Sequence, residues 1–278
     1  ERIWTELIGQ EEKYGWKSGS LTGKNPLEAL RLFKHLDLID LLFSPENYEL
    51  NSWNSEQCSS HHDLNIIDHT LEVFKELYIN DYRNKKEYNP QDLAVRFLAV
   101  IYHDIGKCYP KFIQQHPDGI HLQYKEHEIG SADLAEAALS NKLNAPIEIK
   151  DRVVKLVRQH MRLHHLEDNP TNKALRHFVR DVGTDWEHSV DIAIADANGK
   201  INKVEGTHLK YEKYRERIRE LLLEQGGETK PKRPINGHEL MQLLNLTPGP
   251  ILGKLFAALD EKLLEDPLMT KEAAFEYI

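Results

Sequence analysis

The sequence is poor in the features that mark secreted, membrane-bound and nucleic-acid-coating proteins. It contains two cysteines in 278 residues, Cys58 and Cys108, too few and too far apart for a disulfide framework, which favours a reducing, cytoplasmic setting. No apolar run approaches the length of a membrane-spanning helix. The net charge of −9 argues against broad, nonspecific nucleic-acid binding, but leaves room for a local basic patch. What is left is a folded, globular protein with 40% hydrophobic residues.

Signals for β-strands are also sparse. Most segments repeat apolar residues at intervals of three and four, as amphipathic helices do, so we predict an all-α fold. Helices are expected at residues 26–43, 66–79, 91–105, 127–143, 146–163, 171–181, 187–199 and 208–224. The stretch 225–234, rich in glycine, proline and charge, predicts a linker, and a small helical module follows it. In that module, Pro250 is expected to start one helix and Thr270 to cap another.

The chain is rich in histidine, with 15 residues. His103 and Asp104 stand side by side at the end of the apolar run AVRFLAVIY, and Gly106 gives the backbone freedom to bend there. A histidine and an aspartate at a helix end are common, so the pair alone is weak evidence for a metal site.

Further residues of the same kinds lie in apolar or carboxylate-rich contexts along the chain. Each is compatible with a satisfied core or capping residue, but together they form an ordered set of metal-ligand types: His69, His103-Asp104, His127, His160 and Asp196. Imidazole and carboxylate are the expected ligands of first-row divalent metals, and a helical bundle can direct such groups from several helices into its interior.

This ordered set resembles the metal-dependent phosphohydrolases of the HD-domain family over residues 60–205. HDIGK is a typical central motif, and ADANGK resembles the segment around the last aspartate. The resemblance implies an HD-type helical bundle with one or two divalent ions, of which Mn²⁺, Ni²⁺, Co²⁺, Fe²⁺ and Mg²⁺ are all candidates. It also implies that no protein nucleophile is required, because paired ions activate water and stabilise the charge at phosphorus.

The resemblance also assigns roles to single residues. One ion would be held by His69, His103, Asp104 and Asp196, and a second by His127 and His160 with Asp104 as the bridge. Lys107 is expected to neutralise a phosphate oxygen. His164, one helical turn after His160, is expected either to replace it as a ligand or to contact phosphate. His61 and His62 form a loop pair that could touch substrate.

The flanks resemble a narrower group, the bacterial CCA-adding tRNA nucleotidyltransferases. Residues 1–59 resemble the helical region after the polymerase head of these enzymes, 206–234 form a long helix and linker, and 235–278 resemble their C-terminal module. The polymerase head itself has no counterpart: no D-x-D pair precedes residue 60, Asp37 and Asp40 fit the polar face of a helix, and GSLTGKN is not a P-loop. We therefore expect neither nucleotide polymerisation nor ATP hydrolysis, whether the chain is a headless relative or the C-terminal part of a longer protein.

Three functions remain open. The first is a phosphoesterase for RNA 3′ ends or nucleotides, with 2′,3′-cyclic phosphodiesterase or phosphatase activity. The second is a catalytically inactive module that binds tRNA-like RNA, with contacts at Lys230, Lys232 and Arg233; the helix before them interleaves its cations with glutamates and is better explained as a solvated face. The third is a hydrolase of small nucleotides, disfavoured because the Glu-Asp pair of the alarmone hydrolases is absent after the HD motif.

Overall fold

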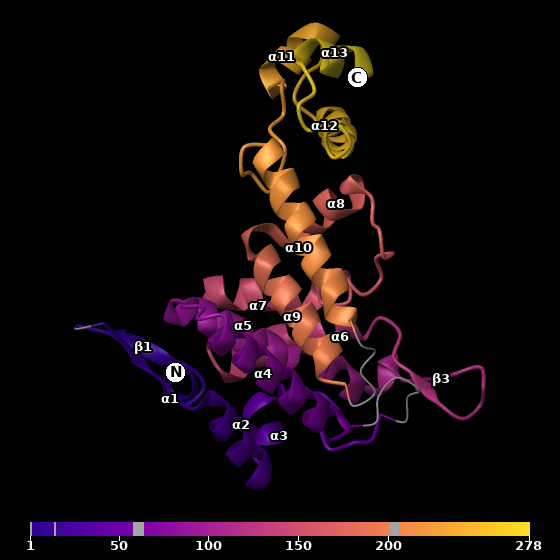
Figure 1. Ribbon diagram of the computed structural model, residues 1–278. Coiled ribbons are helices and arrows are strands. Elements are labelled where there is room, and N and C mark those ends of the chain that lie inside the picture. The colour runs from indigo at the N-terminus through magenta and orange to yellow at the C-terminus, as the bar shows by residue number, and fades with distance from the viewer. Residues whose placement is uncertain (1, 14, 58–63, 201–205) are drawn as a thin grey trace. The chain divides into compact units, whose positions relative to one another are not determined.

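The computed structural model describes residues 2–13, 15–57, 64–200 and 206–278, and most of them are helical (Figure 1). The chain divides into two compact units. The first contains Glu1–His165 and Glu187–Tyr211, and the second contains Leu166–Trp186 and Glu212–Ile278. Within the described ranges, none of the helices combines the length and hydrophobicity that a bilayer-spanning helix requires. The all-α prediction is confirmed.

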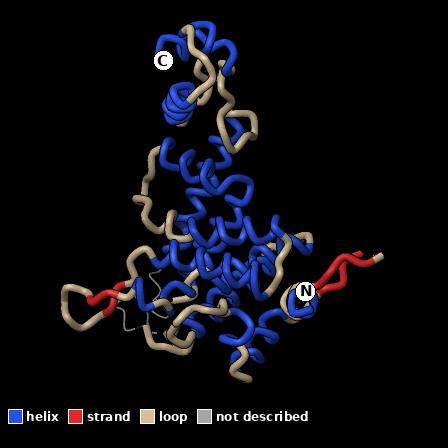
Figure 2. The backbone as a smooth tube through the Cα atoms, turned by 180° about the vertical axis from the view of Figure 1, so that it is seen from behind, coloured by secondary structure: helices blue, strands red, loops and turns tan. Residues whose placement is uncertain are grey.

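The first unit holds most of the helices. Its elements are α1 (Arg2–Leu7), β1 (Gly9–Glu12), β2 (Gly15–Ser18), α2 (Pro26–His35), α3 (Ile39–Phe43), α4 (Ile66–Arg83), α5 (Pro90–Tyr102), β3 (Gln114–Gln115), β4 (Leu122–Gln123), α6 (His127–Ala137), α7 (Ile147–Gln159) and α9 (Trp186–Asn198). Strands occur, among the described residues, as two short antiparallel hairpins (Figure 2). Gly9 pairs with Ser18 in one and Gln114 with Gln123 in the other.

The core of this unit is built around α5. Its residues from Ala94 to Tyr102 are all buried, which explains why this stretch is apolar on every face apart from Arg96. Helix α5 packs against α4 and α7, and α6 packs against α7 and the 3₁₀ turn Ile105–Cys108. Asparagine side chains cap the central helices: Asn65 accepts from the Asp68 N–H in α4, and Asn89 accepts from the Asp92 N–H in α5.

The helix predicted over residues 26–43 is wrong in one respect, because it is broken in two. Helix α2 ends at His35, and Asp37 adopts a left-handed conformation with φ of 54° before α3 begins at Ile39. A non-glycine residue in this region disrupts the helical ladder, so Asp37 and Asp40 do not share one continuous helix face.

Two of the predicted helices also end earlier than expected. The predictions 91–105 and 146–163 extend past the observed ends of α5 at Tyr102 and α7 at Gln159. The next residue in each case, His103 and His160, is the C-cap. Both helices therefore stop where a candidate metal ligand begins.

The second unit contains α8 (Asn172–Val182), most of α10 (Thr207–Glu224), α11 (Gly237–Leu244), α12 (Pro250–Leu263) and α13 (Lys271–Tyr277). Pro250 begins α12, and Thr270 accepts from the Ala273 N–H at the start of α13, as predicted. The core of the C-terminal helices consists of Ile235, Leu240, Leu259, Leu263 and Ala274.

Helix α8 differs from the predicted grouping, which placed residues 171–181 in the same body as the candidate metal ligands. In the structure α8 belongs to the second unit, where Lys173 pairs with Glu265 at 2.7 Å and Arg180 pairs with Glu261 at 2.6 Å. The four domain ranges drawn from the sequence stay predictions.

Candidate metal centre

The six side chains predicted to bind metal all lie in the first unit, at or near the ends of its helices. His69 is in the first turns of α4, and Asp196 is close to the end of α9. His127 is the first residue of α6, while His103 and Asp104 occupy the bend after α5. All six are buried. Helix ends suit this purpose because the backbone can change direction there and aim consecutive side chains inward.

The first cluster consists of His69, His103 and Asp196. One ligand atom from each lies within 4.8 Å of the others. The Nε2 atom of His69 is 2.9 Å from Asp196 Oδ1 and 3.4 Å from His103 Nε2. Three ligand atoms at such separations can face one cation.

The second cluster consists of Asp104, His127 and His160, again with ligand atoms within 4.8 Å of one another. His127 Nε2 lies 3.1 Å and His160 Nε2 lies 3.8 Å from Asp104 Oδ1. The other oxygen of the same carboxylate, Oδ2, lies 3.4 Å from His103 Nε2 and 3.5 Å from His69 Nε2. Asp104 therefore offers one oxygen to each cluster.

Three of the histidines are oriented by the same backbone contact. The Nδ1 atoms of His103, His127 and His160 lie 2.7, 2.8 and 2.7 Å from the carbonyl oxygens of Val100, Tyr124 and Val157, in each case three residues earlier in the chain. A carbonyl can only accept, so each Nδ1 carries the proton and donates it. In the neutral ring, which is the form that binds metal, the Nε2 lone pair is then left for a cation, the usual arrangement of a metal-binding histidine.

The electrostatics of the centre favour positive charge. Burial opposes ionisation of Asp104, but Lys107 and His103 outweigh it and hold the pKa of Asp104 well below its usual value. Burial likewise opposes a charge on Asp196, but Lys200 and His164 lower the pKa of that carboxyl. Both carboxylates are therefore ionised at neutral pH in a buried site.

The imidazole of His160 supplies a direct test of fit for a metal. Burial, followed by the positive fields of His127 and His103, lowers the pKa of His160 well below its usual value, so the ring is neutral. Its buried Nε2 has no hydrogen-bond partner among the described residues. A buried lone pair without a donor is costly unless a ligand takes it. Four imidazoles and two carboxylates suit a borderline divalent cation, so the residues fit the group.

Lys107 is buried, unlike a lysine that binds phosphate at a protein surface. Its side chain is 5% exposed, and its Nζ atom donates to Asp104 Oδ2 at 2.7 Å and to Gln57 Oε1 at 3.0 Å. The ring of Tyr124 lies 5.9 Å from the same nitrogen. Gln57 and Tyr124 were not identified from the sequence, because neither has a pattern that distinguishes it from an ordinary polar residue.

His164 belongs to neither three-residue cluster. Its Nε2 atom lies 3.0 Å from Asp196 Oδ2, and its Nδ1 atom lies 2.8 Å from the hydroxyl of Tyr211. His160, by contrast, is part of the second cluster. His61 and His62 lie outside the described residues.

Gly106 sets the distance between the HD bend and α6. Its N–H donates to Ser131 Oγ at 2.8 Å. A Cβ atom at this position would overlap the carbonyl oxygen of His127 and come within 2.7 Å of the Ser131 nitrogen. Only glycine allows the bend carrying Asp104 to approach the helix carrying His127 so closely.

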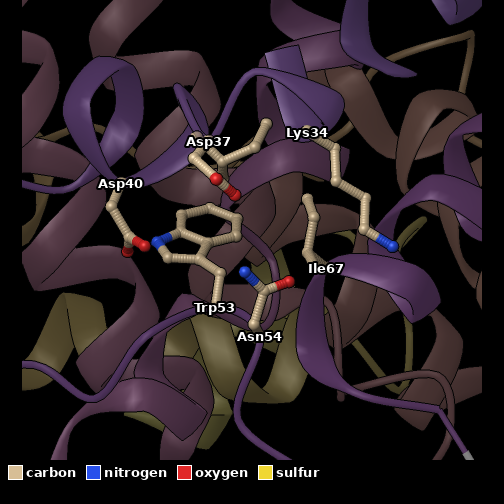
Figure 3. Close-up of a pocket in the computed structure, with 7 residues that line it drawn as sticks. Lys34, Asp37, Asp40, Trp53, Asn54 and Ile67 are labelled. Atoms are coloured by element: carbon tan, nitrogen blue, oxygen red, sulfur yellow. The ribbon is translucent and has the colours of Figure 1, made fainter. Parts of the chain in front are cut away.

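A small pocket lies beside α2 and α3, with a volume of about 20 Å³, room for about one water molecule. Figure 3 shows the carboxylates of Asp37 and Asp40 near the Trp53 indole, Asp40 next to its ring nitrogen. Ser52 Oγ donates to Asp40 Oδ2 at 3.1 Å, so this carboxylate has a local partner. Neither aspartate belongs to a metal-sized cluster among the described residues.

Comparison with known proteins identifies the family of the chain. The HD domain family matches residues 66–222, more than half of the chain. The chain belongs to the HD domain family. HD domains belong to a superfamily of metal-dependent phosphohydrolases, and the matched range includes all six candidate ligands of this HD protein.

Two curated proteins are similar to the HD protein over a wider range. It is 30% identical over 182 residues to the CC-adding tRNA nucleotidyltransferase of Thermus thermophilus, covering 65% of this chain and 38% of the relative. It is 28% identical over 201 residues to the A-adding tRNA nucleotidyltransferase of Deinococcus radiodurans, covering 72% of this chain and 43% of the relative. The aligned part therefore spans less than half the length of either relative.

Proposed function

We propose that this HD protein is a metal-dependent phosphoesterase acting on RNA 3′ ends or nucleotides, with 2′,3′-cyclic phosphodiesterase or phosphatase activity. The observation that carries the proposal is the position of Asp104, whose two carboxylate oxygens face two separate clusters of imidazoles. A carboxylate shared in this way is suited to bridge two cations, as sites for in-line displacement at phosphorus require.

The ligands follow from the same geometry. His69, His103 and Asp196, with Asp104, are assigned to one ion, and His127 and His160, with Asp104, to the other. Bound divalent ions supply the positive charge that a phosphoryl group needs and activate water as the nucleophile.

Residues of the protein orient the metal ligands and set the charge around them. Carbonyl contacts keep three Nε2 lone pairs turned inward, and burial of the ligands limits competition by bulk water. Lys107, fixed by Asp104 and Gln57, adds a positive charge beside the place assigned to phosphate. His164 contributes through Asp196.

The proposed substrate class draws on the relatives. Both are named as tRNA nucleotidyltransferases, proteins that act at RNA ends, which supports an RNA 3′ terminus over an unrelated phosphoester. Contacts to RNA at the linker remain a prediction; there Arg233 makes two bonds of 2.6 Å to Asp260, and Lys232 lies 3.5 Å from Glu228.

The test is hydrolysis of 2′,3′-cyclic AMP, and of a short RNA ending in a 2′,3′-cyclic phosphate, with Mn²⁺, Ni²⁺, Co²⁺ or Mg²⁺. We expect turnover by the wild type and a loss of about 100-fold or more in Asp104→Asn, because loss of even an outer contact to a ligand costs about 10–100-fold. Asp133→Asn, at an exposed carboxylate paired with Arg158, is the matched control and should remain active.

The same experiment separates the alternatives. Preference for the RNA over the small nucleotide supports action on RNA ends, and the reverse preference indicates a nucleotide hydrolase. Tight RNA binding without turnover in any metal indicates an inactive RNA-binding module. Full activity of Asp104→Asn would rule out the assigned centre.

A further inference from the structure

Asp196 is held from both sides. Its Oδ1 atom lies 2.9 Å from His69 Nε2 in the first cluster, and its Oδ2 atom lies 3.0 Å from His164 Nε2. The hydroxyl of Tyr211, in the second turn of α10, lies 2.8 Å from the other ring nitrogen of His164. The two rings meet edge to face with centroids 5.5 Å apart. A continuous chain of contacts therefore runs from α10 to the candidate metal ligand.

The protonation pattern of this chain differs from that of the three inward-facing histidines. Asp196 accepts and does not donate, so a proton on Nε2 of His164 suits the 3.0 Å contact between them, whose geometry is that of an ion pair and not of an aligned hydrogen bond. The Nδ1 atom then has a lone pair, which accepts from the Tyr211 hydroxyl. In His103, His127 and His160 the proton is on Nδ1 instead. In this tautomer His164 directs its Nε2 proton at the carboxylate and keeps no Nε2 lone pair for a cation.

We propose that Tyr211 and His164 are positioning residues that fix the orientation of Asp196, so that Oδ1 stays directed at the ion assigned to His69 and His103. This inference rests on the proposed metal centre. Carboxylates and imidazoles that bind metals depend on such outer contacts, and their loss lowers metal affinity by about 10–100-fold. Tyr211 is itself buried, at 2% exposure, so water does not easily replace its hydroxyl.

The inference makes a site-specific prediction. Tyr211 reaches only Asp196 by this route, and Asp196 belongs to the first cluster. Removing the hydroxyl should therefore lower the affinity for one ion by about 10–100-fold. The affinity for the ion assigned to Asp104, His127 and His160 should stay nearly unchanged.

The matched pair of variants is Tyr211→Phe and Tyr214→Phe. Tyr214 lies on the same helix, is equally buried, and bonds the Glu167 carbonyl at 2.5 Å instead of a histidine. Isothermal titration with Mn²⁺ gives the affinity of each equivalent, and thermal unfolding in EDTA gives the stability without metal. We expect one weakened equivalent in Tyr211→Phe, wild-type affinities in Tyr214→Phe, and similar unfolding temperatures for both variants in EDTA.

Variants of His164 separate positioning from ligation. Glutamine can donate an N–H to Asp196 and accept from Tyr211, so His164→Gln should retain more Mn²⁺ affinity than His164→Ala. If His164 were a ligand, both variants would lose the same equivalent. Positioning also predicts a kinetic pattern for the His164 variants. The KM for metal should rise, while kcat at saturating Mn²⁺ stays within about threefold of the wild type.

Several results would overturn the inference: wild-type affinities in Tyr211→Phe, equal weakening in Tyr211→Phe and Tyr214→Phe, or a wild type that binds no cation at the first cluster. Failure of the proposed activity is a separate result. A wild type that binds two Mn²⁺ ions but hydrolyses none of the phosphoesters refutes the phosphoesterase, and the affinity difference between the two tyrosine variants still decides the role of Tyr211.

Discussion

Arg96 should be one of the most sensitive positions in the first unit. It is fully buried within α5, where its guanidinium bonds both oxygens of Asp81 at 2.7 and 2.8 Å and Asp191 Oδ2 at 2.8 Å. The guanidinium carbon of Arg96, Cζ, lies 4.2 Å from the ring centre of Tyr88. Lys86 bonds both oxygens of Asp191 at 2.8 Å from the other side. This network joins α4, α5 and α9, which carry His69, His103 and Asp196.

The substitution Arg96→Met keeps most of the side-chain volume but removes the guanidinium from both Asp81 and Asp191, while Lys86 still bonds Asp191. Removing one partner of a buried ion pair costs about 3–5 kcal/mol, because the remaining charge has lost both water and its counterion. If the free energy of unfolding falls by about 2.5 kcal/mol for each molar increase in urea, the urea concentration at the unfolding midpoint should fall by about 1.5 M. Three of the four tryptophans lie in the first unit, so fluorescence reports mainly its unfolding.

The matched control is Arg31→Met, which breaks an exposed pair with Glu28 at 2.6 Å and should cost no more than about 0.5 kcal/mol. The double variant Arg96→Met/Asp81→Asn should be less destabilised than the sum of its single changes, since the orphaned charge is removed.

Acidification supplies a second signature. Burial raises the pKa of Asp81, against the opposing field of Arg96. Without Arg96 the folded-state pKa rises further above the unfolded value, so Arg96→Met should recover stability as the pH falls from 7 and a carboxyl takes up a proton. A midpoint shift no larger than that of Arg31→Met, or a deficit that grows on acidification, would refute this reasoning.

Three further changes have definite expected outcomes. Gly106→Ala should lower Mn²⁺ affinity by about 10-fold or more and destabilise the first unit, because its Cβ would overlap the His127 carbonyl oxygen; titration and urea unfolding measure both effects, and unchanged values would contradict the close packing. Thr270→Ala should cost about 1 kcal/mol, since the cap on the Ala273 N–H is lost; amide exchange in α13 should rise, whereas Thr270→Ser should behave like the wild type. Lysine contacts lower the pKa of Glu265 to about 2, so its contribution is present above pH 4.5 and is lost as the pH falls towards 2; the stability gap between wild type and Glu265→Gln should close over that range, and a gap independent of pH would show that the carboxylate contributes nothing.

The helical fold was predictable because most segments bury one face of a helix and show that face in their spacing. The C-terminal module was readable for the same reason, and its cap at Thr270 is confirmed. Asn236 and Glu239 form a capping box at α11, and the same pair of residue types three apart is visible in the sequence. The break at Asp37 was not predictable, since left-handed aspartate leaves no periodic signal. The β1–β2 hairpin was missed because GQEE has no β-branched or aromatic residue.

The candidate ligands were located because each is a polar group in an apolar context, and the structure brings His69, His103 and Asp196 into one cluster and the remaining three into another. Their role as ligands stays a prediction. The contacts around them were not readable. Tyr211 lies in a helix whose lysines, arginines and glutamates predict a solvent-exposed helix, yet the Tyr211 side chain is buried. Only the three-dimensional position of α10 connects it with Asp196.

His103 and His160 each terminate a helix and, with the same ring, present a lone pair to the centre. The ring N–H bonds a carbonyl of the last turn of α5 or α7, and at Val157 it joins the backbone N–H of His160 on the same oxygen. Alanine at either position thus removes a helix stop together with a potential ligand, and part of the damage should persist in chelator. Because one side chain both caps the helix and can bind metal, loss of metal binding at these two positions would also weaken the helix end. A relative without the metal chemistry is therefore expected to keep a hydrogen-bond donor at the positions of His103 and His160.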